Sequence, residues 1–357
     1  MKKKLLLYAF TQNNLGDDLF IKILCERYSN HDFYIGLENK NINKTLKNIK
    51  NLHFDNKLFK IDELLKKESF FSNHLNFKFN IIQMFNVKYL KSFDSTIFII
   101  GSAFIQNNPS KDYTNLYLLE KRVKSSNNFF LLNTNFGPYY DEKYLSFSRE
   151  IVSNMTHATF RDKFSYDLFK DLKNVSYAPD LVLNLKNDIN TSNKTILISI
   201  MDLNDKYINL IIDLINEINN KNFNCKLVSF CKNQNDEIAA NKIKEKINVD
   251  FLAYDGNMDE ILYEFKTCYG IISTRFHSMI IAMAYNKPFL PFIYSKKTNE
   301  VLDDINYKNI RLDINTLVNT NVKKTIDDFL EYNYIDIESY KNKAKNQFKA
   351  LDDYFNN

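Results

Sequence analysis

Several residue types are scarce or absent in this sequence of 357 residues. It has no tryptophan, six glycines, five prolines and four cysteines. The cysteines form no C-x-x-C pair, and no histidine stands beside them at the spacing of metal ligands. We therefore expect no metal centre. We also expect four free, buried thiols, as in a protein of the reducing cytoplasm.

The sequence also lacks a long apolar run. No stretch approaches the roughly 20 residues that a helix needs to cross a bilayer, and the apolar part of the N-terminal segment is too short for a signal peptide. We expect a cytoplasmic protein, either free or at the inner face of the membrane with at most peripheral contact. The net charge is +5, but the basic residues are dispersed, so the sequence does not indicate a nucleic-acid partner.

A regular alternation of short apolar runs and amphipathic segments is present instead. Apolar runs at 5–10, 96–100, 129–136, 195–201 and 270–273 are each followed by a segment with helical periodicity. This alternation predicts βαβ units and parallel sheets. We predict an α/β fold with two Rossmann-like domains whose parallel sheets face a central cleft.

A polar, Asn-rich segment at 184–194 separates the two halves and is interpreted as a linker. We therefore predict an N-terminal domain at 1–185, a C-terminal domain at 186–325, and helices at 326–357 that pack back on the body.

The region 37–92 is also polar and Asn-rich. It carries helical periodicity only at 61–67 and 79–90. It therefore predicts two helices but no strand.

Strand-to-helix turns are the candidate ligand sites, because ligands of open parallel sheets bind at the carboxyl ends of strands. At "STRFHS", an arginine and a histidine lie two residues apart where a predicted strand becomes a helix. A cation is mildly unfavourable in a first helical turn, but Arg275 can hold an anion at two points and His277 can exchange a proton. We expect Ser273 or Thr274 to cap the helix. An exposed arginine and a histidine bonded to a loop remain the plain alternative.

The turn "TQNNLGDDLF" contains a single glycine, Gly16, which permits close approach of the backbone to a ligand or neighbour. One glycine is not the G-x-G-x-x-G fingerprint, so dinucleotide binding is poorly supported. We expect Asp17 to cap the following helix, and the spacing alone favours a plain capped helix start.

The remaining turns carry weaker signals, and each one alone is interpreted as structural. Gly101 follows a predicted strand, and Gly137 precedes a proline in a turn. Asp162 beside Arg161 is suited to a helix N-cap, and Asp180 follows a proline in an extended segment.

Together, these segments resemble one family. In order along the chain they read "NNLGDDLF", "NFGPYY", "FRDKFSYDLF", "YAPDLVL", "STRFHSMIIAMAYNKPF" and "FIYSKK". The set resembles the polysaccharide pyruvyl transferase family over residues 4 to about 305, and the Arg-Phe-His-Ser segment is its most specific part. The resemblance implies a GT-B-like fold. It implies transfer of the pyruvyl group of phosphoenolpyruvate, without a cofactor, to a sugar of a surface polysaccharide or its lipid-linked precursor as a ketal.

The resemblance also implies roles for individual residues. Arg275 would hold one anionic group of the donor, Arg161 would supply a second cationic contact, and His277 would perform acid–base work or neutralise the departing phosphate. The other residues expected to bind the donor are Ser273, Thr274, Ser278, Tyr294 and Lys297, and those expected to line the acceptor side are Asn14, Gly16 and Asp17.

Two departures from the family pattern leave the donor open. The turn that is usually glycine-rich reads Gly101-Ser102-Ala103, and Met201-Asp202 stands where many relatives carry an arginine. A GT-B glycosyltransferase that uses a nucleotide sugar is therefore the second hypothesis. A non-catalytic binding or assembly protein of a polysaccharide locus is the third. We expect the region 37–92 to influence the choice of acceptor.

Overall fold

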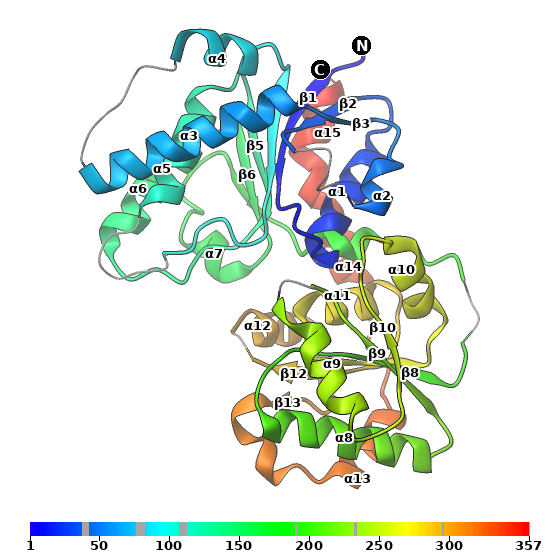
Figure 1. Cartoon of the computed structure of the whole chain (residues 1–357). Coiled ribbons are helices and arrows are strands. Elements are labelled where there is room, and N and C mark those ends of the chain that lie inside the picture. The colour runs from blue at the N-terminus through cyan, green and yellow to red at the C-terminus, as the bar shows by residue number, and fades with distance from the viewer. Residues whose placement is uncertain are drawn as a thin grey trace.

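The computed structural model describes residues 1–37, 43–75, 83–106, 113–189, 192–231, 234–294 and 296–356. They form two parallel sheets, each flanked by helices, with the N-terminal sheet above the C-terminal one in Figure 1. The predicted α/β fold with two Rossmann-like halves is confirmed.

The N-terminal sheet has seven strands in the order β3-β2-β1-β4-β5-β6-β7. The order reverses between β1 and β4, where open parallel sheets bind their ligands. The strands are β1 (Lys4–Ala9), β2 (Asp32–Ile35), β3 (Leu52–Phe54), β4 (Ser95–Ile99), β5 (Phe129–Thr134), β6 (His157–Phe160) and β7 (Val175–Tyr177). The helices of this half are α1 (Leu15–Arg27), α2 (Lys44–Lys47), α3 (Asn56–Leu75), α4 (Gln83–Leu90), α5 (Thr114–Lys124), α6 (Glu142–Ser153), α7 (Lys163–Asp167) and the 3-10 helix η2 (Leu181–Asn184).

The C-terminal sheet has six strands in the order β10-β9-β8-β11-β12-β13, which reverses in the same way between β8 and β11. The strands are β8 (Thr195–Ser199), β9 (Asn224–Val228), β10 (Asp250–Leu252), β11 (Gly270–Ser273), β12 (Phe289–Ile293) and β13 (Leu312–Asp313). The helices of this half are α8 (Asp205–Asn220), α9 (Asp236–Lys244), α10 (Met258–Thr267), α11 (Phe276–Ala284), α12 (Lys296–Asp304), the 3-10 helix η4 (Ile314–Asn319) and α13 (Val322–Leu330).

The region 37–92 contains more structure than its composition predicts. The helix expected at 61–67 extends through the 20 residues of α3. Part of the helix expected at 79–90 lies outside the described residues, and α4 covers the rest. The strand β3 was not predicted, because three residues are too few for a recognisable period.

One hydrophobic core joins the two halves of the molecule. Leu15 and Leu19 on α1 share a cluster of buried side chains with Met258 and Ile261 on α10 and with Met283 on α11. Because α1 belongs to the first sheet and α10 and α11 to the second, the two halves bury apolar surface against each other.

The last three helical segments, α14 (Glu338–Ala344), η5 (Lys345–Phe348) and α15 (Lys349–Asn356), return to the N-terminal half. The ring of Phe355 packs against Tyr28 with centroids 4.8 Å apart, and Tyr354 packs against Phe130 at 5.2 Å. The C-terminus therefore lies close to the N-terminus (Figure 1).

Two further expectations from the sequence can be compared with the structure, one about the cysteines and one about membrane-spanning helices. The four cysteines are free and buried, as predicted. Within the described ranges, no helix is both long and apolar enough to cross a membrane.

Candidate functional site

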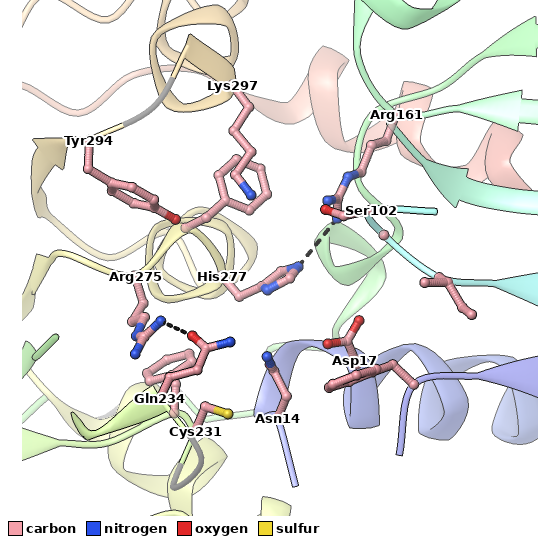
Figure 2. Close-up of a pocket in the computed structure, with 15 residues that line it drawn as sticks. Asn14, Asp17, Ser102, Arg161, Cys231, Gln234, Arg275, His277, Tyr294 and Lys297 are labelled. Carbon is pink, nitrogen blue, oxygen red and sulfur yellow. Dashed lines mark hydrogen bonds between the residues drawn. The ribbon is translucent and has the colours of Figure 1, made fainter. Parts of the chain in front are cut away.

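A cavity of about 300 Å³ lies between the two halves, where strands of both sheets end. We call it the interdomain pocket. The turns after β1, β4 and β6 line it from the N-terminal half, and those after β9, β11 and β12 line it from the C-terminal half. Residues predicted for the site that line it are Asn14, Asp17, Arg161, Arg275, His277, Tyr294 and Lys297 (Figure 2).

The turn before α1 is held directly against the C-terminal half. Asn14 forms an antiparallel bridge with Cys231, and the backbone N–H of Leu15 donates to the carbonyl of Phe230 at 3.0 Å. The side chain of Asn14 also caps α1 by accepting from the N–H of Gly16 at 3.1 Å. The prediction that Asp17 caps this helix is therefore wrong. Because Asn14 is the cap, Asp17 lies in the first turn and faces the pocket.

His277 lies at the centre of the pocket (Figure 2). Its imidazole rests on Gly16, where a Cβ atom would collide with the ring. The ring of Phe20 meets it edge-on with centroids 5.3 Å apart. Gly16 therefore does not line the cavity itself but makes room for the histidine that does.

Burial keeps the imidazole of His277 neutral. Its Nε2 atom lies 3.8 Å from Asp180 Oδ2 and 3.5 Å from Arg161 Nη1. Burial lowers the pKa of His277 to about 3; Asp180 opposes this shift, while Arg161 and Lys297 add to it. At neutral pH the free protein therefore presents an uncharged imidazole that can accept a proton.

The guanidinium of Arg161 lies at the pocket and already forms hydrogen bonds within the protein. Arg161 is 5% exposed, its Nη1 donates to Asp180 Oδ2 at 2.9 Å, and its Nη2 donates to Asn135 Oδ1 at 2.8 Å. Asp180 also accepts from the N–H of Val182 at 2.9 Å. The charge of this arginine is therefore balanced within the protein before any ligand binds.

Arg275 is paired in a similar way. Its guanidinium donates to Gln234 and to Asp236, and Asp236 is fully buried. Asp236 also accepts from the N–H groups of Phe230 and Cys231, at 2.9 and 3.1 Å. Burial raises the pKa of Asp236, and Arg275 opposes that shift. Within the described ranges, the buried Nε of Arg275 has no hydrogen-bond partner.

Three of the predicted residues lie beneath the pocket and do not line it. They are Ser273, Thr274 and Ser278, which are buried. Ser278 Oγ donates to the carbonyl of Arg275 at 2.6 Å. Ser199 Oγ accepts from the N–H groups of Thr274 and Arg275 at 3.0 and 3.2 Å. These hydroxyls hold the backbone that presents Arg275.

The cap expected for α11 is also corrected. The N-cap position is Arg275, and no side chain caps the helix from that position. Neither Ser273 nor Thr274 is the cap, because both lie further from the helix, with backbone held by β11 and by Ser199.

Lys297 and Asp17 complete the charged lining. Lys297 Nζ lies 5.1 Å from the centroid of the Phe276 ring, and no acidic side chain among the described residues forms an ion pair with it. Burial lowers the pKa of Lys297 to about 8, and Arg161 adds to the shift. Burial raises the pKa of Asp17 to about 6 and that of Tyr294 above its usual value.

Sequence reasoning missed three residues of this arrangement. From the sequence, Asp180 is interpreted as structural, and neither Asp236 nor Gln234 carries a functional signal. Asp236 and Arg275 are 39 residues apart, so only the order of strands in the folded sheet brings them together.

Comparisons with known proteins agree with this architecture. A family model described as polysaccharide pyruvyl transferase matches residues 14–296. A search of curated proteins finds no match. Among solved structures, the UDP-GlcNAc 2-epimerase from Neisseria meningitidis bound to UDP-GlcNAc is 12% identical, with 100% of each chain covered and a TM-score of 0.57.

Two further structures are similar over nearly their whole length. Alr3699/HepE from Anabaena, in complex with UDP and glucose, is 11% identical and has a TM-score of 0.53, with 99% of this chain and 95% of that chain covered. A glycosyltransferase from Rickettsia africae is 14% identical and has a TM-score of 0.51, with 99% and 98% covered. At these identities the likeness shows the fold alone. That fold is GT-B, as predicted.

Proposed function

The chain belongs to the polysaccharide pyruvyl transferase family, and we propose that it transfers the pyruvyl group of phosphoenolpyruvate to a sugar of a cell-surface polysaccharide or its lipid-linked precursor. A location in the cytoplasm or at the inner face of the membrane, where such a precursor is accessible, belongs to the same proposal.

The observation that carries the proposal is the cationic side chain of Lys297 in the interdomain pocket. It lies over Phe276, the first residue of α11, and it lacks an ion-pair partner among the described residues. A helix N-terminus favours anions. Phosphoenolpyruvate carries a phosphate and a carboxylate, so Lys297 and the start of α11 offer it complementary contacts.

Two groups in the pocket have pKa values displaced in opposite directions, which is the usual mark of an acid and a base. His277, with a pKa of about 3, is neutral and can accept a proton. Asp17, with a pKa of about 6, holds a proton on about one molecule in ten at pH 7. In the proposal, Asp17 is the acid and His277 is the base.

The transfer then takes place in two balanced steps. Asp17 gives a proton to C3 of phosphoenolpyruvate while the oxygen of a sugar hydroxyl bonds to C2 and passes its proton to His277. The imidazolium that forms lies 3.8 Å from Asp180, which stabilises it. In the second step, another hydroxyl of the sugar bonds to C2 as the C2–O bond to phosphate breaks. Phosphate leaves with the proton of that hydroxyl, and a cyclic ketal remains. His277 then releases its proton to solvent and Asp17 takes one up, which restores the starting forms of both residues.

The test measures thermal stabilisation by phosphoenolpyruvate and, separately, by a panel of nucleotide sugars. A ligand that binds only the native state raises the Tm, with about 2.7 kcal/mol of stabilisation at 100 times its Kd. We expect phosphoenolpyruvate to raise the Tm of the parent protein and not that of Lys297→Met. Lys170→Met is the matched control, because Lys170 is exposed and does not line the pocket. Stabilisation by neither class of donor would refute the proposal.

A specific observation keeps the nucleotide-sugar hypothesis as the second candidate. At Met201-Asp202, where the resemblance leads us to expect an arginine, this chain has no cation, and Asp202 pairs with the nearby Lys242 at 2.9 Å. Two of the similar solved structures hold UDP or UDP-GlcNAc. Stabilisation by a nucleotide sugar alone would favour this second function.

A further inference from the structure

A second and larger cavity, of about 1110 Å³, lies beside the interdomain pocket along the N-terminal sheet. Phe10, Ile100 and Ser102 line both cavities, so the two adjoin each other. Beyond these shared residues, the ends of β1 and β2 and the helices α3 and α5 form the walls. We call this cavity the N-terminal groove.

Among the described residues, every charged side chain that lines the N-terminal groove is paired with an opposite charge that lines it too. Asp62 accepts from Arg122, with Nη2 at 2.5 Å, and Lys66 lies 2.8 Å from Glu63. The sixth charge, on Asp255, pairs with Lys44 at the end nearest the C-terminal half.

The groove therefore differs from the interdomain pocket, where Lys297 is an unpaired cation among the described residues. An anionic ligand would have to break an ion pair in order to find a cation in the groove. An uncharged ligand would not.

The uncharged part of the lining combines aromatic rings with amides. Phe10, Phe59 and Tyr8 are partly exposed and line the groove. An aromatic ring has a negative face that attracts the positively polarised C–H groups of a sugar ring. The guanidinium of Arg122 already lies 4.1 Å from the centroid of Tyr8, so Phe10 and Phe59 are the rings available to a ligand.

The amide of Asn13 provides a hydrogen-bonding group in the same wall. Its Oδ1 is buried and has no hydrogen-bond partner within the described part of the chain. An unsatisfied buried oxygen costs free energy unless a ligand donates to it. A sugar hydroxyl can donate to this oxygen once the Asn13 side chain turns it towards the groove, since hydroxyls both donate and accept.

We propose that the N-terminal groove binds several uncharged sugar units of the acceptor, next to the sugar that reacts in the interdomain pocket. This assignment rests on the proposed function, because it identifies the class of its acceptor. It makes the substrate an oligosaccharide or polymer instead of a single sugar. If the substrate is lipid-linked, its charged pyrophosphate lies outside the groove.

The first experiment measures retention of the labelled protein on an array of oligosaccharides, from monosaccharides to hexasaccharides, in neutral and uronate-containing forms. We expect retention on neutral chains to increase with chain length and to fall about tenfold in Phe59→Ala, which corresponds to about 1.4 kcal/mol. Phe70→Ala is the matched control: Phe70 is on the same helix, 51% exposed and outside the groove.

A second experiment locates the binding. Because the sequence has no tryptophan, Phe59→Trp places a single fluorophore in the groove and Phe70→Trp places one outside it. We expect the neutral hexasaccharide that is retained best to shift the emission of the first variant and not of the second. The reverse pattern would overturn the assignment. So would retention of uronate-containing chains only, equal retention of mono- and hexasaccharides, no retention at all, or unchanged retention of Phe59→Ala.

Thermal stabilisation by phosphoenolpyruvate, measured on the same preparation, separates the two proposals. Stabilisation by the donor together with retention of acidic chains only refutes the groove assignment and leaves the proposed function standing. Retention of neutral chains without donor stabilisation refutes the choice of donor and leaves the groove assignment standing.

Discussion

At the scale of single residues, burial explains the acid–base properties of the interdomain pocket. Burial disfavours the charged form of both Asp17 and His277. It therefore raises the pKa of Asp17 and lowers the pKa of His277. The donor also needs a charged Lys297, whose pKa is about 8. The rate should therefore depend on pH through three groups with known directions of shift.

The first prediction concerns that dependence. If protonated Asp17 is the acid, kcat/KM should decrease about tenfold per pH unit above pH about 6 and more steeply above pH about 8, where Lys297 loses its proton. Initial rates of phosphate release between pH 5 and 9 measure it. A kcat/KM that rises from pH 5 to 7 would instead make ionised Asp17 a base.

The second prediction concerns stability. The folded-state pKa of Asp17, about 6, is above the usual aspartate pKa of 3.8, so burying the ionised carboxylate costs free energy that is fully present above pH 6. At pH 8, Asp17→Asn should raise the free energy of unfolding by about 1–3 kcal/mol, at about 1.36 kcal/mol per pKa unit, while abolishing turnover. The gain should shrink as pH falls from 6 towards 3.8, because native Asp17 then takes up its proton. Urea unfolding of both proteins at pH 8 and near pH 4 checks this. A variant that is less stable than the parent at pH 8 would contradict it.

The third prediction concerns Gly16, where a Cβ atom would collide with His277. Gly16→Ala should destabilise the fold by about 1–3 kcal/mol, as overpacking does, and should lower kcat at least tenfold because the imidazole must move. In a double-mutant cycle with His277→Ala, most of the destabilisation should vanish. Additive free energies would show that the alanine clashes with something other than the histidine.

At the scale of elements, the C-terminal segment supports the site from behind. Gln347 on η5 is fully buried. Its Nε2 donates to the carbonyls of Ala178 and Pro179 at 2.7 and 3.2 Å, and its Oε1 accepts from the N–H of Asn133 at 3.0 Å. The residue that follows Pro179 is Asp180, which contacts both Arg161 and His277. A helix near the end of the chain therefore positions a carboxylate of the pocket.

The fourth prediction follows from this support. Gln347→Leu removes three hydrogen bonds and leaves their backbone partners buried, so it should cost about 2–4 kcal/mol in unfolding free energy and lower kcat more than it raises KM for the donor. Asn346→Leu, on the same short helix but exposed, is the control. Equal effects of the two substitutions would mean that η5 acts only through general packing.

Some helices and strands could be predicted well from the sequence, and others could not be predicted at all. Strands such as β4 and β5 were predictable because they are buried from end to end and read as continuous apolar runs. The three-residue strands β3 and β7 left no such pattern. The cap of α1 was misassigned to Asp17, because several residues of that turn can cap a helix and only the bridge to Cys231 selects Asn14.

At the scale of the whole molecule, the two halves share a core. α1 contributes Leu15 and Leu19 to the same buried cluster as Met258 and Ile261 of α10. Tyr254, just after β10, donates to Asp18 of α1 at 2.6 Å. Separating the halves would expose this cluster and the buried carboxyl of Asp18.

The fifth prediction is that heat unfolds the two halves together. Calorimetry should show one transition whose calorimetric and van 't Hoff enthalpies agree. The domain boundary expected at residue 185 would then mark a change of sheet but not an independently stable unit. Two resolved transitions would contradict the prediction.

The family and the two-domain architecture were accessible from the sequence, because they depend on local patterns and short motifs. The internal pairing of the pocket was not. Arg161 and Arg275 were expected to bind an anionic ligand, but each already forms an ion pair within the protein. Their partners are Asp180 and Asp236. These partners are set by strand order and burial, which no local spacing encodes.

That pairing has a consequence for the end of the reaction cycle. Two arginines without internal partners would hold phosphate tightly and slow its departure. Here a buried carboxylate already pairs with each guanidinium, so neither arginine is free to hold the product tightly. Product release should therefore not limit turnover, and inorganic phosphate should compete only weakly with the donor.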